Sequence, residues 1–351
     1  MAASASDGAG AWASCVRLGR PLRSPSTMVG VKRRRPSAGD ILLTAALNAA
    51  AAPPTTFFYG GQAVIEGVLM RGPRHYAVAA RRPDGAITVL SERLRSRVYT
   101  GRPWSLPFLR GAATLWEMLA LGMRALQWSA NIQLGEDVEL SQGAMGVTIG
   151  VSVIFGLGLF IGLPLLVSAV IHHGAPQSVA SVLIEGVARA VILLGYLFLI
   201  GLLSSVRRVF EYHGAEHKAI NCLESGDPVE VPEVRRASRL HPRCGTGFLV
   251  VVALVSVIVF TPLGFLFWPV RIACQIALIP VVAGVSYEVI RGLARIRHTR
   301  FGKIALAPVL AAQLLSTREP DDAQIEVAIA ALAAARSADE GAVGEAYATV
   351  P

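Results

Sequence analysis

The sequence predicts a mostly α-helical membrane protein with four spans, a small N-terminal β-hairpin unit and an amphipathic helix at the membrane interface. Two observations lead to this prediction. Of the 351 residues, 53% are hydrophobic and only 16% are charged, whereas ordinary soluble domains are about 25% charged. The chain also contains long stretches without any charged residue, and a span needs about 20 apolar residues. This composition excludes a disordered chain, and the four cysteines are too few for a disulfide scaffold.

Residues 1–58 are predicted to form a disordered basic tail. They are rich in Ala, Ser, Pro and Arg, and they include the basic run 32–35 (KRRR). The hydrophobic core of a secretory signal is missing from them. Two interpretations remain: an organelle transit peptide, or an over-long start with Met28 as the true first residue. We favour the second.

Residues 59–104 are predicted to form a small polar unit that contains a β-hairpin. Within 77–89, two short strands flank the pair Asp84-Gly85. An Asp-Gly pair between two strands is a strong signal for a tight hairpin turn, because glycine readily adopts a positive φ.

Residues 105–139 are predicted to form an amphipathic helix that lies in the membrane interface. Arg110, Glu117 and Arg124 recur every seven residues, so they share one face of an otherwise apolar helix. Tryptophans along the same segment are typical of interfacial helices. The alternative is a fifth span with a buried ion pair.

The four spans are predicted at 145–171, 182–206, 247–267 and 272–287, as two transmembrane hairpins over 140–206 and 245–290. The first charge-free run, 140–184, exceeds what a buried helix of a soluble protein uses. Glu185 and Arg189 are four residues apart near the start of the second span. An ion pair between them would lower the cost of inserting both charges.

The distribution of Arg and Lys predicts the orientation of the spans. The 207–244 loop holds seven of these residues, while the two opposite connections together hold only Arg271. The positive-inside rule then places this loop, both termini and the C-terminal segment 291–351 in the cytoplasm. We therefore expect a multi-pass protein of a bacterial plasma membrane, or of a plastid membrane if residues 1–58 are a transit peptide. These charges explain the basic pI, so no nucleic-acid partner is expected.

The acidic tail is predicted to contain an Ala-rich helix over about 322–335. Asp321 can cap this helix with Gln324 three residues further on.

A candidate metal motif lies at the start of the cytoplasmic loop. His213, Glu216 and His217 form the pattern H-x-x-E-H, an inverted form of the zinc-protease signature. On a helix, imidazoles four residues apart face the same way and can bind zinc or another divalent metal. The Glu is the general base in such sites. The alternative is that both His pair with carboxylates at the membrane boundary, and Gly214 inside the motif weakens a helix.

A third metal ligand is expected from the end of the same loop. His241 and Cys244 are three residues apart just before the third span, and both side chains are common zinc ligands. Alternatively, Cys244 is only a small residue at a helix start and His241 meets lipid headgroups. Cys222 and Cys274 are expected to be buried packing residues.

At these motifs the chain resembles the YqhQ family of bacterial integral membrane proteins. The resemblance covers about 59–332 and is strongest at 59–73 (YGGQAVIEGVLMRGP), 212–218 (YHGAEHK), 239–248 (RLHPRCGTGF), 280–288 (PVVAGVSYE) and 317–322 (TREPDD). It implies a multi-span membrane protein with its polar motifs on one side. It also implies a metal-dependent enzyme, because the family carries that label as a prediction.

The preferred functional hypothesis is a metal-dependent hydrolase with its site on the cytoplasmic face. His213, His217 and one of His241 or Cys244 would hold the metal, with Glu216 as the general base. The alternative is a non-catalytic membrane assembly or binding protein that docks a partner or a lipid headgroup. A transporter is a weaker third hypothesis, because an internal repeat and a charged midplane path are missing. Apart from the lipid bilayer, the sequence identifies no partner, substrate or oligomeric state.

Overall fold

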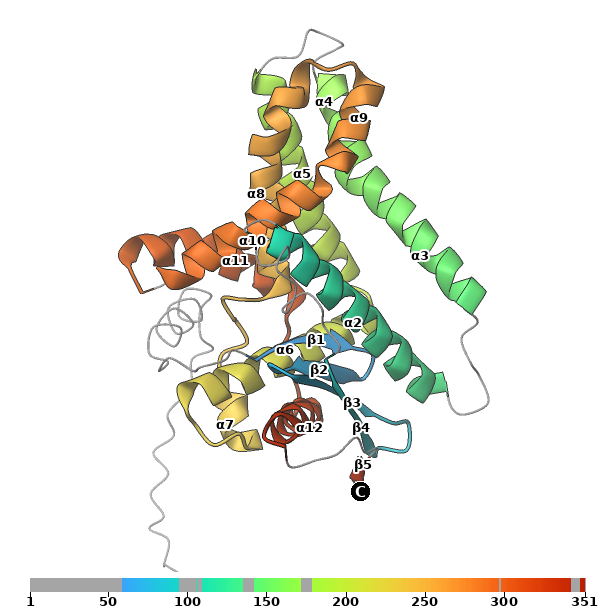
Figure 1. The fold of residues 1–351 in the computed structure, drawn as a ribbon, viewed down its shortest axis with the longest axis vertical. Coiled ribbons are helices and arrows are strands. Elements are labelled where there is room, and N and C mark those ends of the chain that lie inside the picture. The colour runs from blue at the N-terminus through green and yellow to red at the C-terminus, as the bar shows by residue number, and fades with distance from the viewer. Residues whose placement is uncertain are drawn as a thin grey trace, which may run out of the picture. The chain divides into compact units, whose positions relative to one another are not determined.

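The computed structural model describes residues 59–94, 106, 109–134, 142–171, 179–296, 298–341 and 348–350. The predicted basic tail 1–58 lies outside the described residues. The described part is mostly helical, with a small antiparallel sheet near its N-terminal end (Figure 1).

The sheet contains more strands than the predicted hairpin. Its members are β1 (Gly60–Val64), β2 (Gly67–Arg71), β3 (His75–Arg81), β4 (Ile87–Arg93) and β5 (Ala348–Val350), paired antiparallel in that order. The predicted hairpin is β3–β4, and its turn residue Gly85 has a φ of 90°. The motif at 59–73 forms the preceding hairpin, in which Glu66 takes a left-handed φ of 50°.

Helices cover both faces of this sheet, so it is an apolar layer rather than a polar unit. Alternation along the strands sends Val68, Met70 and Ala77 to one face, where they pack against α6 (Ser204–Ser225) and α12 (Asp322–Asp339). Leu69 and Val78 point to the other face, against α2 (Leu109–Leu134). In Figure 1 the sheet lies between α2 and α12.

Two of the three charged residues of α2, Arg110 and Glu117, have partners elsewhere in the protein, while Arg124 is exposed. Arg110 donates two hydrogen bonds to Glu288, at 2.7 and 2.6 Å, and Arg71 lies 3.7 Å from Glu117. Among the described helices, α2 is not one of those apolar enough to cross a membrane, so the alternative of a fifth span has no support. Its predicted place in the membrane interface stays a prediction.

Within the described residues, three helical stretches are long and apolar enough to cross a membrane, and a bent pair could form a fourth span. The first three are Gly146–Ile171, Val182–Ile200 and Gly245–Gly264. They are formed by α3 (Gln142–Leu157), η2 (Gly158–Gly162) and α4 (Leu163–Ile171); by α5 (Val179–Ile200); and by α8 (Gly245–Phe260) with η3 (Thr261–Phe265). The bent pair is α9 (Trp268–Ala277) and α10 (Ile279–Arg295), with an angle of 49° between them.

Two of the four predicted spans need correction. The second predicted span, 182–206, is not one continuous helix, because α5 ends at Ile200 and α6 starts at Ser204. Leu203 between them is extended, with ψ at 129°, which breaks the helical path. The fourth predicted span is bent because a new helix starts beside Pro280, whose ring nitrogen cannot donate a helical hydrogen bond.

The C-terminal part holds one helix that the sequence did not predict, α11 (Arg300–Ser316), which packs against α8. The short helix α7 (Val231–Arg236) lies in the loop between α6 and α8. The predicted Ala-rich helix is α12. Asp321 and Gln324 form its capping box, as expected from their spacing.

A buried cluster of charges connects the apolar helices. Glu185 accepts hydrogen bonds from Arg189 at 2.9 Å, from Gln275 at 3.1 Å and from Arg271. Arg189 also donates to the Phe160 carbonyl in the π-helix η2, at 3.0 Å. The predicted pair is therefore part of a larger group in which one carboxylate balances two guanidinium groups. Losing that carboxylate would leave two buried positive charges unbalanced.

We expect Glu185→Gln to lower the free energy of unfolding by about 3–5 kcal/mol, the usual cost of breaking a buried ion pair. Arg271→Gln is the matched control, because it leaves Glu185 paired with Arg189 and should cost less. Thermal unfolding of the detergent-purified variants measures both effects. A loss in Arg271→Gln as large as that in Glu185→Gln would contradict this account.

Candidate metal centre

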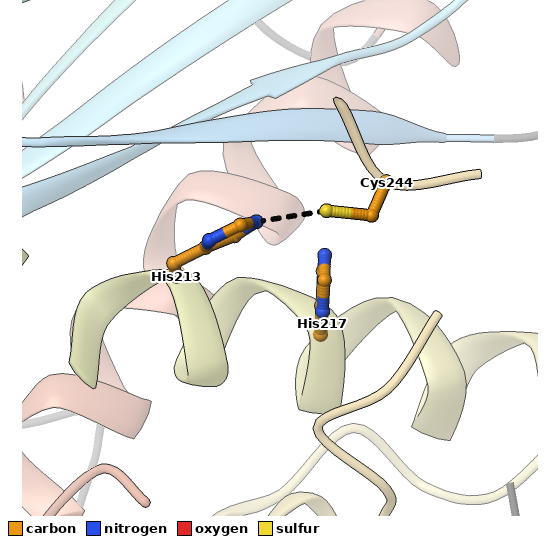
Figure 2. Close-up of side chains that lie close together, drawn as sticks. All are labelled: His213, His217 and Cys244. Carbon is orange, nitrogen blue, oxygen red and sulfur yellow. Dashed lines mark hydrogen bonds between the residues drawn. The ribbon is translucent and has the colours of Figure 1, made fainter. Parts of the chain in front are cut away.

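Three potential metal ligands meet where α6 passes the start of α8. His213 and His217 are one turn apart on α6, with ring centroids 4.4 Å apart. Cys244 is the residue just before α8, and its thiol points toward both rings (Figure 2). The ligand atoms of the three residues all lie within 4.8 Å of one another. Zn–N bonds are about 2.0–2.1 Å and Zn–S bonds about 2.3 Å long, so the three atoms lie close enough together to share one ion after small side-chain movements.

Backbone carbonyls orient both imidazole rings. His213 Nδ1 lies 2.9 Å from the Ser316 carbonyl oxygen, and His217 Nδ1 lies 2.6 Å from that of Arg239. Because a carbonyl only accepts, each Nδ1 must carry the proton when the ring is neutral. Each Nε2 then keeps its lone pair for a metal, which is the usual arrangement of histidine ligands.

Side chains of α6 also hold the segment that delivers Cys244. Lys218 Nζ donates to the carbonyls of Arg235 and Ala237, at 3.0 and 2.9 Å. Asn221 Nδ2 donates to those of Ser238 and Leu240, at 2.6 and 3.0 Å. Arg235 lies in the last turn of α7 and the other three residues lie beyond it, so these carbonyls lack helical partners and the α6 side chains satisfy them.

His241 has a different environment from the other three predicted ligands. Its Nε2 lies 3.7 Å from Glu224, on the side where Arg243 pairs with that carboxylate. Burial, together with nearby Arg243, lowers the pKa of His241 to about 4 despite Glu224. Of the two candidates for the third ligand, Cys244 joins the compact group with His213 and His217, whereas the His241 ring lies 5.7 Å from that of His217 and stays outside the group.

The local charges favour a thiolate at Cys244. Burial alone would raise the pKa of this thiol, but His213 and His217 outweigh it and hold the pKa well below its usual value. The Thr246 amide at the start of α8 adds a hydrogen bond to the sulfur at 3.4 Å. Burial alone would lower the pKa of His213, but Cys244, 3.3 Å from Nε2, raises it to about 9. A divalent cation would take the place of the His213 proton.

Glu216 lies beside the ligands without joining them. Its carboxylate is 4% exposed, and Oε2 lies 3.9 Å from His213 Nε2 with no hydrogen-bond partner among the described residues. The Gly61 amide of β1 hydrogen-bonds the carboxylate, but burial dominates and raises its pKa. A carboxyl with a raised pKa next to a metal site is typical of a general base.

Two glycines from the family motifs permit this close packing. A Cβ on Gly61 would lie 2.9 Å from Glu216 Cγ, and a Cβ on Gly214 would collide with the Arg318 carbonyl oxygen. Gly214, which weakens a helix, is therefore explained by the contact of α6 with the segment 317–320. The sequence did not single out Gly61 within its motif. Ser316 contributes only its backbone carbonyl, which orients His213, and a pattern of side chains in the sequence cannot identify such a contribution.

The donor set fits zinc. Two imidazole nitrogens and one thiolate are borderline to soft ligands, which zinc prefers over the oxygen ligands of Mg²⁺ and Ca²⁺. Three protein ligands are also the number found in catalytic zinc sites, whereas structural sites use four. Among the described residues, no fourth His, Cys, Asp or Glu joins the group.

Comparison with known proteins supports the motif-based resemblance. A family model described as "Protein of unknown function (DUF1385)" matches residues 106–338. The chain is 36% identical over 287 residues to the Bacillus subtilis (strain 168) protein named "Uncharacterized protein YqhQ", across 77% of this chain and 89% of that protein. No solved structure matches the chain. The chain therefore belongs to the YqhQ family of DUF1385 proteins.

Proposed function

We propose that this protein is an integral membrane, zinc-dependent hydrolase with its site on the cytoplasmic face. The observation that carries the proposal is the convergence of His213, His217 and Cys244 within 4.8 Å. Glu216 beside them supplies a base that is not itself one of the ligands. The identity of the metal, zinc or another divalent ion, and the hydrolytic reaction both belong to the proposal.

Each residue has a distinct role in such a reaction. His213, His217 and Cys244 would hold the ion, which supplies a Lewis acid and lowers the pKa of water. Glu216 takes a proton from the attacking water, whose oxygen forms a bond to the acyl or phosphoryl centre. As the bond to the leaving group breaks, Glu216 returns the proton to that group.

The alternative is a non-catalytic assembly or binding protein with a structural metal. Burial favours it, because His217 and Cys244 are only 1% and 6% exposed, and structural zinc sites are closed to solvent. The two proposed functions give Glu216 different roles. In a closed structural site Glu216 would complete the ligand set, whereas in a catalytic site it stays outside it.

The orientation of the protein can be tested with reporters. A reporter fused after Gly226 should be cytoplasmic, and one inserted at Gly174 should be external, because the 207–244 loop concentrates Arg and Lys. Alkaline phosphatase and fluorescent-protein fusions measure the two positions. A cytoplasmic reporter at Gly174 would invert the proposed topology.

The metal site can be tested by elemental analysis. Purified wild-type protein should carry about one zinc per chain, and His213→Ala, His217→Ala and Cys244→Ala should each lose it, because two ligands rarely hold zinc. His241→Ala is the matched control. It removes a buried histidine of the same loop that faces Glu224 instead, so it should keep its metal. Equal metal content in wild type and the three ligand variants would refute the site.

The role of Glu216 needs a separate variant. Glu216→Gln should keep zinc at the wild-type level, since it removes a base and not a ligand. Turnover of an ester substrate should fall by a factor of about 10²–10⁴. If the variant instead loses zinc as Cys244→Ala does, Glu216 is a ligand, and the structural-metal alternative becomes the better account.

A further inference from the structure

The start of α8 exposes a strip of surface directly beside the ligand cluster. Gly245 follows Cys244 and is exposed, and a Cβ built on it would meet no atom within 4 Å. Leu249, one turn further along the helix, is 41% exposed. Residues four apart share a helix face, so the strip runs from the cluster along α8. Gly247, which packs on α11, lies on another face.

This strip lies at the end of the apolar helices. Gly245 is the first residue of the candidate span Gly245–Gly264, and α6 begins just after the candidate span Val182–Ile200 ends. Leu202 and Leu203, between α5 and α6, are also exposed. If these helices cross the membrane, the cluster lies where lipid headgroups meet hydrocarbon.

Little of the ligand cluster is exposed. Glu216, His217 and Cys244 are buried, and the cluster lies next to β1 of the sheet, whose residue Gly61 contacts Glu216. His213 is the most accessible of the group, with 17% of its side chain exposed. A large water-soluble substrate therefore has little surface to approach.

From these observations we infer that the site acts on a lipid-like amphiphile that reaches it from the bilayer. Its hydrolysable group would enter beside Gly245 while its hydrocarbon chain lies along Gly245 and Leu249. A transmembrane peptide fits less well, because its backbone is hydrogen-bonded within a helix and would have to unwind to reach a buried site. This inference names the substrate class for the proposed hydrolase and rests on that proposed function.

The test measures access to Cys244 and needs no turnover. The full chain is placed in lipid nanodiscs with Cys15, Cys222 and Cys274 changed to Ala, and bound metal is removed with a chelator. Cys244 is then alkylated with N-dodecylmaleimide or with N-methylmaleimide, and intact mass gives the two rates. Because each reagent is compared only with itself across variants, its partitioning into lipid cancels.

We expect Gly245→Phe and Leu249→Trp to slow alkylation by the dodecyl reagent about tenfold, as a bulky group in a close passage does. The methyl reagent should be affected much less. Leu254→Phe is the matched control, since Leu254 is exposed on another face of the same helix. If the dodecyl rate is unchanged in both strip variants, or if Cys244 does not react with that reagent at all, the membrane route is wrong.

Metal content of the same samples, measured before the chelator is added, separates the two proposals. Protein that lacks zinc but shows the strip-dependent rate would refute the zinc hydrolase and keep the membrane route. Protein that binds zinc but whose alkylation rate is unchanged by the strip variants would refute the membrane route and keep the zinc site.

Discussion

Hydrogen bonds from α6 side chains to the carbonyls of the segment 235–240 hold the site together. That segment has little regular structure after α7, so its backbone acceptors need partners from elsewhere. His217, Lys218 and Asn221 supply them from a five-residue stretch of one helix. The same bonds have a chemical consequence, because the bond from His217 Nδ1 to Arg239 directs Nε2 toward Cys244. The same set of hydrogen bonds therefore stabilises the segment and orients a candidate metal ligand.

The helices and the sheet approach closely enough for this only because two side chains are absent. Gly61 lets β1 reach the Glu216 carboxylate, and Gly214 lets α6 accept the segment 317–320 against its backbone. A glycine within a helix costs about 1 kcal/mol relative to alanine. The contact replaces that loss with new bonds: the Arg318 amide donates to Phe210 at 2.8 Å, and Glu319 pairs with Lys218 at 3.0 Å.

Short-range patterns in the sequence predicted the features that depend on residues close together in the chain. The four-residue spacing of His213 and His217, the Asp84-Gly85 turn and the Asp321 capping box depend on nearby residues alone, and each is present. The choice between His241 and Cys244 could not be made this way. Gln313, 72 positions away, holds the His241 backbone by hydrogen bonds to its N–H and its carbonyl, at 2.9 and 2.8 Å, and such a long-range contact has no local signal. The break after Ile200 and the helix α11 likewise have no strong local signal.

Burial and ligand number support different functions for this cluster, and the proposed route along α8 would reconcile them. A site closed on every side would be structural, but a structural zinc takes four protein ligands and only three converge here among the described residues. Glu216 Oε2, which has no hydrogen-bond partner in the part of the chain that the structure describes, also needs a proton donor, since a buried acceptor without one is unfavourable. Water or a substrate group at the open coordination position would supply that donor. A site that is buried from water and reached along α8, as inferred from the exposed strip Gly245–Leu249, would be consistent with catalysis on a membrane-borne substrate.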